Sequence, residues 1–218
     1  MDYANTPQSL MATLKRRGIR DPRVLAAMEA VPRHLFVPPQ FERIAYADEA
    51  LPIGCRQTIS QPFIVAYMIE ALQLKYGARV LEVGTGSGYQ AAVLAHIAGR
   101  VYSIERHKAL ADSARALIAR LGIKNVVILA GDGRAGHSEA APFDGIVVSA
   151  AAKTVPEALL DQLGEGGRMV LPLEEAGGQR LVLIEKRDGA FARRDLIAVR
   201  FVPLIETPGN RIKVNKRD

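Results

Sequence analysis

The sequence predicts an α/β fold: a doubly wound, mostly parallel sheet with an antiparallel edge, preceded by an N-terminal helical region. Three observations support this. From residue 79 onward, apolar runs alternate with amphipathic stretches, as strands and crossover helices do in a parallel sheet. The first run, 80–83, leads into a turn with glycine at three alternate positions. The last two runs, 180–185 and 198–204, flank Asp188-Gly189 and leave no room for a crossover helix, which indicates antiparallel pairing.

Two short helices are expected at the start of the chain. Thr6-Pro7 and Asp21-Pro22 each place an N-cap residue before a proline at the first helical position. They predict helices over 8–17 and 23–30.

A polar loop separates these helices from a third one. Residues 45–61 show neither helical nor clear strand periodicity, and a loop of this length in a compact domain is often functional. Pro62 opens a helix that is expected to end near Gly77. We therefore divide the chain into residues 1–76, the N-terminal helical region with a substrate loop, and residues 77–218, the ligand-binding α/β domain. The two parts are expected to form one compact unit.

Hydrophobic periodicity gives the remaining elements. Further strands are predicted over 100–104, 126–129, 143–149 and 168–171. The other helices are predicted over 90–95, 108–121 and 156–163.

The spacing of the glycines selects among the ligands that such a turn can bind. A dinucleotide fingerprint would need a glycine at position 89, where the chain has Tyr89, and the Lys-Ser/Thr pair of a phosphate-binding Walker loop is missing. Glu82, two residues before Gly84, would repel a pyrophosphate but suits a ligand that carries an ammonium and a sulfonium. The turn Gly84-Thr85-Gly86-Ser87-Gly88 therefore predicts S-adenosyl-L-methionine as the cofactor. The alternative is a purely structural strand-to-helix turn.

Two acidic residues are placed to complete a cofactor site, because ligands of open α/β sheets bind beyond the carboxyl ends of the strands. Glu105 lies 21 residues after Gly84 at the end of the second strand, where a carboxylate can accept both hydroxyl hydrogens of a ribose. Asp132 stands between Gly131 and Gly133 after the third strand and can accept from an adenine amine, while the Gly133 N–H reaches the ring. A plain turn aspartate is the alternative for Asp132.

Composition narrows the partners and the compartment. The net charge is +6, but the basic excess lies at the two ends, and the tail 210–217 has no aromatic residue, unlike a nucleic-acid-binding stripe. Cys55 is the only cysteine, so neither an intramolecular disulfide nor a cysteine-rich metal site can form. No apolar run approaches the ~18 residues of a membrane span. We expect a cytoplasmic protein without a metal, acting as a monomer and independent of nucleic acid and membrane.

Several motifs together resemble the protein-L-isoaspartate O-methyltransferase family over most of residues 24–204. The glycine block alone would indicate only a methyltransferase, and the Gln57–Pro62 block makes the resemblance specific. The matching segments are Arg33 with Phe36-Val37-Pro38, Leu51-Pro52-Ile53-Gly54, Gln57-Thr58-Ile59-Ser60-Gln61-Pro62, Leu81 to Leu94, Tyr102 to Arg106, Gly131-Asp132-Gly133 and Val199 to Leu204.

The resemblance implies a Rossmann-like fold and a protein-repair activity. The family transfers methyl from S-adenosylmethionine to the free α-carboxylate of L-isoaspartyl residues in damaged proteins, and the ester then closes to a succinimide. The implied cofactor-binding residues are Glu82, Gly84, Thr85, Gly86, Gly88, Glu105, Asp132 and Gly133. The implied substrate-binding residues are Thr58, Ile59, Ser60 and Val202, with Ser60 as the catalytic residue. Peptides are expected to lie between the Gly54–Ser60 loop and the segment 199–204.

Methyl transfer to a carboxylate places modest demands on the protein. A carboxylic acid with a pKa of roughly 3–4 is already ionised at pH 7, so no base is needed to activate it. A neutral hydroxyl such as that of Ser60 can hold the carboxylate and leave it nucleophilic. The alternative is that Ser60 is the N-terminal cap of the helix that begins at Pro62.

One departure from the family pattern concerns Arg56, which stands where the family commonly has glycine. If that position needs a positive φ, Arg56 strains or reshapes the loop. It could instead add a carboxylate-binding cation.

Three other functions remain open from the sequence alone. They are a methyltransferase acting on a small molecule or RNA, a NAD-binding oxidoreductase, against which Tyr89 argues, and a non-catalytic binding module.

Overall fold

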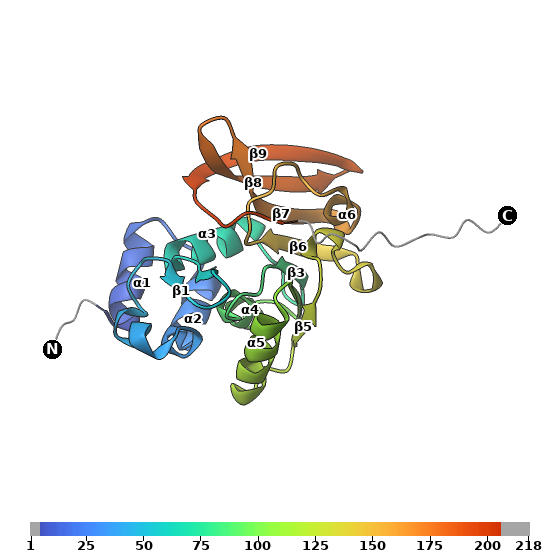
Figure 1. The fold of residues 1–218 in the computed structure, drawn as a ribbon. Helices are drawn as coiled ribbons and strands as arrows, with labels where there is room; N and C mark the ends of the chain where they lie inside the picture. The colour runs from blue at the N-terminus through green and yellow to red at the C-terminus, as the bar shows by residue number, and fades with distance from the viewer. Residues whose placement is uncertain (1–4, 206–218) are drawn as a thin grey trace.

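The computed structural model describes residues 5–205, and the basic tail 210–217 lies outside them. A seven-stranded sheet has the order β5-β4-β3-β6-β7-β8-β9 (Figure 1). Its parallel strands are β3 (Arg79–Val83), β4 (Arg100–Glu105), β5 (Val126–Ala130) and β6 (Phe143–Val148), with β7 (Leu163–Glu175) parallel to β6. The antiparallel edge consists of β8 (Gly178–Arg187) and β9 (Ala190–Val199). The predicted fold class is therefore confirmed.

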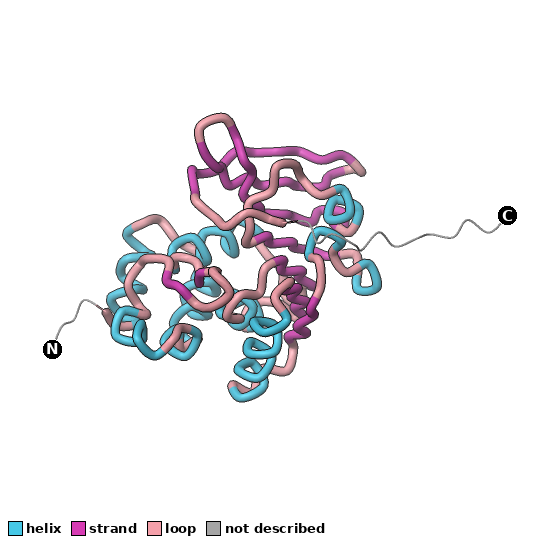
Figure 2. Tube along the Cα trace, in the orientation of Figure 1, coloured by secondary structure: helices cyan, strands magenta, loops and turns pink. Residues whose placement is uncertain are grey.

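Helices cover the two faces of the sheet unequally. One face packs against α3 (Pro62–Leu72), α4 (Tyr89–Ala95) and α5 (Lys108–Arg120). On the same side, α1 (Pro7–Arg16) and α2 (Pro22–Ala30) pack against α3 and α4 and join the same apolar cluster. The other face packs against α6 (Glu157–Asp161) and the 3₁₀ turn η4 (Ser138–Ala140). Figure 2 shows the helical region beside the sheet, with the antiparallel strands projecting away from it.

Strand β3 illustrates why these sequences form a central parallel sheet. Val80 belongs to the apolar cluster on the α1–α5 side, whereas Leu81 and Val83 belong to the cluster on the opposite side. A strand covered on both faces needs apolar residues at nearly every position, and β3 has them from Val80 to Val83 except at Glu82. Glu82 is thus a carboxyl group inside an otherwise apolar strand.

Local signals explain the helical N-terminal region. Thr6 caps α1 and forms a reciprocal capping box with Ser9, and Asp21 caps α2 by accepting from the Arg23 N–H. Residues from these helices share one continuous apolar cluster with the sheet, reaching from Leu10 to Leu183. The division into residues 1–76 and 77–218 stays a prediction.

Three expectations for individual elements are wrong. The third helix ends at Leu72 rather than near Gly77, because Gln73 adopts a left-handed conformation with φ 47°. The loop 45–61 contains a small hairpin, β1 (Leu51–Pro52) with β2 (Thr58–Ile59), too short to show periodicity.

The third wrong expectation is a last strand over residues 198–204. Strand β9 ends at Val199, and the chain then turns back across the carboxyl edge of the sheet. There the Ala151 N–H donates to the Val202 carbonyl at 2.8 Å, and the Leu204 N–H donates to the Ala151 carbonyl at 2.7 Å. This return brings residues 202–205 over the ends of β3 and β6, where a ligand would bind.

Candidate active site

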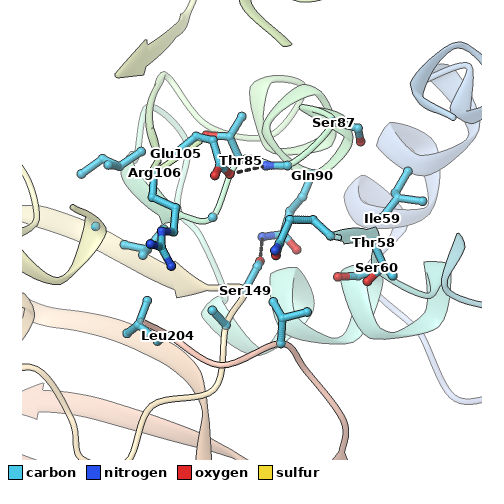
Figure 3. Close-up of a pocket in the computed structure, with 18 of the residues that line it drawn as sticks. Thr58, Ile59, Ser60, Thr85, Ser87, Gln90, Glu105, Arg106, Ser149 and Leu204 are labelled. Carbon is cyan, nitrogen blue, oxygen red and sulfur yellow. Dashed lines mark hydrogen bonds between the residues drawn. The ribbon is translucent and has the colours of Figure 1, made fainter. Parts of the chain in front are cut away.

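A cavity opens at the carboxyl ends of β3, β4 and β6 and the turn after β5. Figure 3 shows Glu105 and Arg106 on one side, Thr58, Ile59 and Ser60 on the opposite side, and Gln90 and Ser149 between them. The predicted site residues that line this cavity are Thr58, Ile59, Ser60, Gly84, Thr85, Gly86, Glu105, Asp132, Gly133 and Val202. Segments more than a hundred residues apart in the chain thus meet at this cavity.

The glycine turn after β3 needs glycine for its backbone shape. Gly84, Gly86 and Gly88 have φ values of 96°, 55° and 89°, in a region that side chains other than glycine adopt at a cost. Gly84 and Gly86 line the cavity. Gly88 does not, and it serves packing instead. A Cβ atom built on it would lie 3.2 Å from the Ala114 Cβ of α5.

Glu105 organises the turn as well as facing the cavity. Its Oε2 accepts from the Gly86 N–H at 2.9 Å, and its Oε1 accepts from the His107 N–H at 2.9 Å. Each oxygen of a carboxylate has two lone pairs, so both can still accept from a ribose. The dashed line at Glu105 in Figure 3 marks the bond from Gly86.

The turn after β5 forms a close-fitting wall. The Asp132 side chain accepts from the Arg134 N–H at 3.0 Å and begins the 3₁₀ turn η3 (Gly133–Ala135). A Cβ atom on Gly133 would lie 2.3 Å from the Val83 Cγ1, so only glycine fits there. The chain after β5 therefore packs directly against β3 at the wall of the cavity, where the adenine of the predicted cofactor is expected.

Glu82 lies behind the cavity wall rather than in it, contrary to its expected direct contact with the ligand. Its side chain is fully buried, and the Ser103 hydroxyl donates to its Oε2. Thr85, at the wall, shares a hydrogen bond with the same Ser103 hydroxyl at 2.5 Å. Burial raises the pKa of Glu82 to about 8, the bonds from Ser103 and Gln90 oppose this rise, and the charge of Glu105 adds to it.

The alternative role of Ser60 as a helix cap does not hold. The N-cap of α3 is Gln61, whose side chain makes no capping bond. Asp48 supplies the missing acceptor from another part of the chain, because its Oδ1 accepts from the Phe63 N–H at 2.8 Å. No hydrogen bond to the Ser60 hydroxyl is found within residues 5–205. This hydroxyl therefore remains available at the cavity.

A second cavity continues from the first between the substrate loop and the end of β9. The two share Thr58, Ser60, Ser149 and Val202. The second is lined further by Ile64, Ile197, Val199 and Phe201, and Arg17 and Arg200 are the charged residues that line it within residues 5–205. We call this second cavity the groove.

Arg56 adopts the conformation that favours glycine. Cys55 and Arg56 have φ values of 52° and 59°, and the Gln57 N–H donates to the Gly54 carbonyl at 2.8 Å. Two successive residues with positive φ define a type I′ hairpin turn, for which glycine is preferred at the second position. The expectation that Arg56 strains the loop therefore fits its positive φ. The guanidinium charge of Arg56 can still act on a substrate.

Replacing Arg56 with glycine is expected to stabilise the protein by about 1 kcal/mol. The left-handed conformation costs a residue with a side chain roughly 1–2 kcal/mol, and glycine avoids this cost. Part of the gain is lost because glycine makes the unfolded chain more flexible. Chemical denaturation of the two proteins measures the difference. Gln57→Gly, next to the turn, is the matched control and is expected to destabilise. A destabilised Arg56→Gly variant would show that Arg56 makes compensating contacts.

Sequence reasoning missed three residues that shape the site. Gln90 donates to the Ser149 hydroxyl at 3.0 Å across the floor of the cavity, as the second dashed line in Figure 3 shows. Asp48 and Arg33 both contact the Ser60 segment from the N-terminal region. The only signal for Arg33 was its place in a family motif, and nothing local pointed to Asp48.

Comparison with known proteins agrees with this geometry. The family model described as protein-L-isoaspartate(D-aspartate) O-methyltransferase matches residues 5–209. A protein-L-isoaspartate O-methyltransferase of Methylorubrum populi is 54% identical over 210 residues, covering 96% of this chain and 99% of that one. One of Methanoculleus marisnigri is 53% identical over 192 residues, covering 88% and 87%.

Solved structures show the same likeness. One protein-L-isoaspartate O-methyltransferase superposes with a TM-score of 0.83 at 32% identity, covering 94% of this chain and 68% of that one. A Plasmodium falciparum protein described by the same activity, solved with S-adenosyl-L-homocysteine, has a TM-score of 0.81 at 32% identity and covers 93% of this chain and all of that one.

The fold, the glycine turn and Glu105 thus define an S-adenosylmethionine-dependent methyltransferase with a Rossmann-like sheet. The family match also covers the N-terminal region and its substrate loop, which narrows the class of methyltransferase further. The chain belongs to the protein-L-isoaspartate O-methyltransferase family.

Proposed function

We propose that this protein transfers methyl from S-adenosylmethionine to the free α-carboxylate of L-isoaspartyl residues in damaged proteins, and that Ser60 holds that carboxylate. One observation carries the residue assignment. The Ser60 hydroxyl lies where the cofactor cavity and the groove meet, and the structure assigns it no hydrogen bond within residues 5–205. A substrate carboxylate that enters through the groove would accept from it.

The cofactor would be held by residues whose chemistry fits its parts. Glu105 would accept from the ribose hydroxyls, and Asp132 with the Gly133 N–H would bind the adenine edge. Gly84, Thr85 and Gly86 leave room for the aminoacyl tail, and Glu82 holds Thr85 at the wall through the Ser103 hydroxyl. Bound S-adenosylmethionine supplies a methyl group that its sulfonium makes electrophilic.

What the chain contributes is position rather than acid–base chemistry. Within the described part of the chain, the cavity lining contains no histidine, cysteine or lysine, and the carboxylate nucleophile needs no base. Alignment of two reactants can supply roughly 7–11 kcal/mol of barrier reduction. The apolar side chains of Ile59, Val65 and Val202 around Ser60 keep water away from the reacting carboxylate.

Peptide recognition would use the groove. Thr58 lines it from the hairpin and Val202 from the returning segment, and Ile59 lines the adjoining cofactor cavity. Extended backbone on both sides suits recognition through main-chain hydrogen bonds, which do not depend on sequence. This suits an enzyme whose substrate is a backbone lesion that occurs in many sequences.

Isoaspartyl peptides and proteins are therefore the proposed partners. No helix within residues 5–205 is long and apolar enough to cross a membrane. The cytoplasmic location, the monomeric state, and the independence of metal and nucleic acid stay predictions.

Replacing Ser60 with alanine tests the proposed role. A lost hydrogen bond to a charged group costs about 1.5–3 kcal/mol, so kcat/KM for an isoaspartyl peptide is expected to fall about 10- to 150-fold. Cofactor affinity, measured by calorimetry, should stay within about twofold. Thr58→Val, in the same loop, is the matched control and should lose less. Unchanged kcat/KM in the Ser60 variant would refute the assignment.

A further inference from the structure

Arg33 is a cation buried without a carboxylate partner. It belongs to the 3₁₀ turn η1 (Arg33–Phe36), its side chain is fully inaccessible, and none of the ion pairs found within residues 5–205 includes it. Burial lowers the pKa of Arg33 from its ordinary value, although an arginine keeps its proton in a protein. A charge held in the interior at this cost needs a reason in the contacts that it makes.

Those contacts join segments that regular structure does not connect. The Arg33 Nε donates to the Ala45 carbonyl at 2.8 Å, and its Nη2 donates to the Ser60 carbonyl at 2.9 Å and to the Glu49 carbonyl at 3.3 Å. The guanidinium carbon lies 4.8 Å from the centroid of the Tyr89 ring. Arg33 therefore contacts the substrate loop at Ser60 and the first residue of α4, directly after the glycine turn.

The shape of the arginine side chain is what allows it to donate to all three carbonyls at once. Three carbonyls in an irregular segment approach one planar group whose donors point in fixed directions. A lysine ammonium is compact and cannot reach all three while its stem lies against Tyr89. An apolar residue would leave buried carbonyls without donors, each at a cost of roughly 1–3 kcal/mol.

A second contact fixes the chain on the other side of Ser60. The Gln61 Nε2 donates to the Asp48 Oδ2 at 3.0 Å, and the Asp48 carboxylate also pairs with Arg17. Ser60 is thus held at its own carbonyl by Arg33 and at the next residue by Asp48. Of the two, Arg33 also contacts the cofactor side of the site.

We propose that Arg33 is a positioning residue for methyl transfer: by binding the Ser60 carbonyl and lying against Tyr89, it fixes the Ser60 hydroxyl relative to the glycine turn. The inference rests on the proposed role of Ser60. Arg33 does not touch the substrate, and it acts only through the place of the Ser60 peptide. Because a displacement of about 1 Å between reacting groups can cost 10²-fold in rate, loss of this bond should be visible in activity.

The first test is Arg33→Lys, which keeps the positive charge and removes the planar arrangement of guanidinium N–H donors. We expect kcat/KM for an isoaspartyl peptide to fall about 10- to 100-fold, with calorimetric affinity for S-adenosylmethionine within about threefold of the wild type. Hydrogen exchange of residues 56–61 in the cofactor-free protein should be faster. Arg23→Lys is the control, because Arg23 also donates to a carbonyl, that of Leu74 at 2.7 Å, away from the cavity. Arg33→Gln replaces the lysine variant if the latter does not reach a folded, cofactor-binding state.

The decisive test is a double-mutant cycle with Ser60→Ala. If Arg33 acts through Ser60, Arg33→Lys should lower kcat/KM less than about threefold in the Ser60→Ala background. If Arg33→Lys lowers kcat/KM equally in the wild-type and Ser60→Ala backgrounds, the inference is overturned and the role of Ser60 stays intact. Wild-type kcat/KM in Ser60→Ala alone would overturn the role of Ser60, and the inference with it.

Discussion

Replacing Glu105 with alanine is expected to weaken S-adenosylmethionine binding by at least about 100-fold. In the proposed cofactor site the variant loses two charge-assisted hydrogen bonds to ribose hydroxyls, each contributing about 1.5–3 kcal/mol. The Gly86 and His107 N–H groups also lose their acceptor, so the turn that receives the cofactor becomes less ordered. Titration calorimetry measures the affinity directly.

Glu105→Gln separates these two contributions. The glutamine keeps the length of the side chain, but in this geometry its single carbonyl oxygen accepts from only one of the two backbone N–H groups, and it has no charge to offer the ribose. It should therefore retain more of the thermal stability of the cofactor-free protein than the alanine variant and still lose roughly 10-fold or more in affinity. An affinity within threefold of the wild type in the alanine variant would show that Glu105 organises the turn only.

Replacing Glu82 with glutamine is expected to change how stability depends on pH. The folded protein holds the Glu82 pKa at about 8, above the ordinary value of 4.5 that applies to the unfolded chain. The folded state thus keeps this proton where the unfolded state releases it. Stability contributed by the neutral carboxyl is fully present below about pH 4.5 and is lost as the pH rises towards about 8. The total loss is on the order of a few kcal/mol.

The glutamine variant has no proton to lose. Its unfolding free energy should match that of the wild type near pH 5 and exceed it by a few kcal/mol near pH 9, as urea denaturation at several pH values would show. Asp112→Asn, at an exposed carboxylate on α5, serves as the control and should leave the wild-type pH dependence in place. Parallel stability profiles for Glu82→Gln and the wild type would mean that Glu82 is already ionised in the folded protein at neutral pH.

Much of the fold could be predicted because local and periodic signals determine it. Proline and cap residues gave the starts of α1 and α2 to within one residue, and apolar runs gave the strands from β3 to β6. The failure at 198–204 has a tertiary cause. The second half of that segment pairs with Ala151 in the loop after β6 rather than with another long strand.

The site could be predicted where chemistry is carried by backbone geometry or by strand ends. The spacing of Gly84, Gly86 and Glu105 predicts that they lie together, because a turn and two parallel strand ends bring them to one edge. Glu82 and Gly88 could not be separated from the lining residues, because which side of a wall a side chain occupies depends on packing against α4 and α5.

The helix-cap alternative for Ser60 shows the same limit. The acceptor for the Phe63 N–H comes from Asp48, 15 residues away, and no local pattern announces it. The contact of Arg33 with the Ser60 carbonyl spans 27 residues and is equally invisible to spacing rules. Long-range side-chain contacts to irregular backbone are what sequence reasoning could not supply here.

Methyl transfer from labelled S-adenosylmethionine to a matched pair of peptides tests the proposed activity most directly. The peptides share one sequence and contain either L-isoaspartate or L-aspartate at a single position. We expect labelled, base-labile methyl ester on the isoaspartyl peptide, with a kcat/KM at least about 100-fold above that for the aspartyl peptide, and strong loss of this signal in Ser60→Ala. Equal labelling of both peptides, or labelling of neither by protein that binds the cofactor, would contradict the proposal.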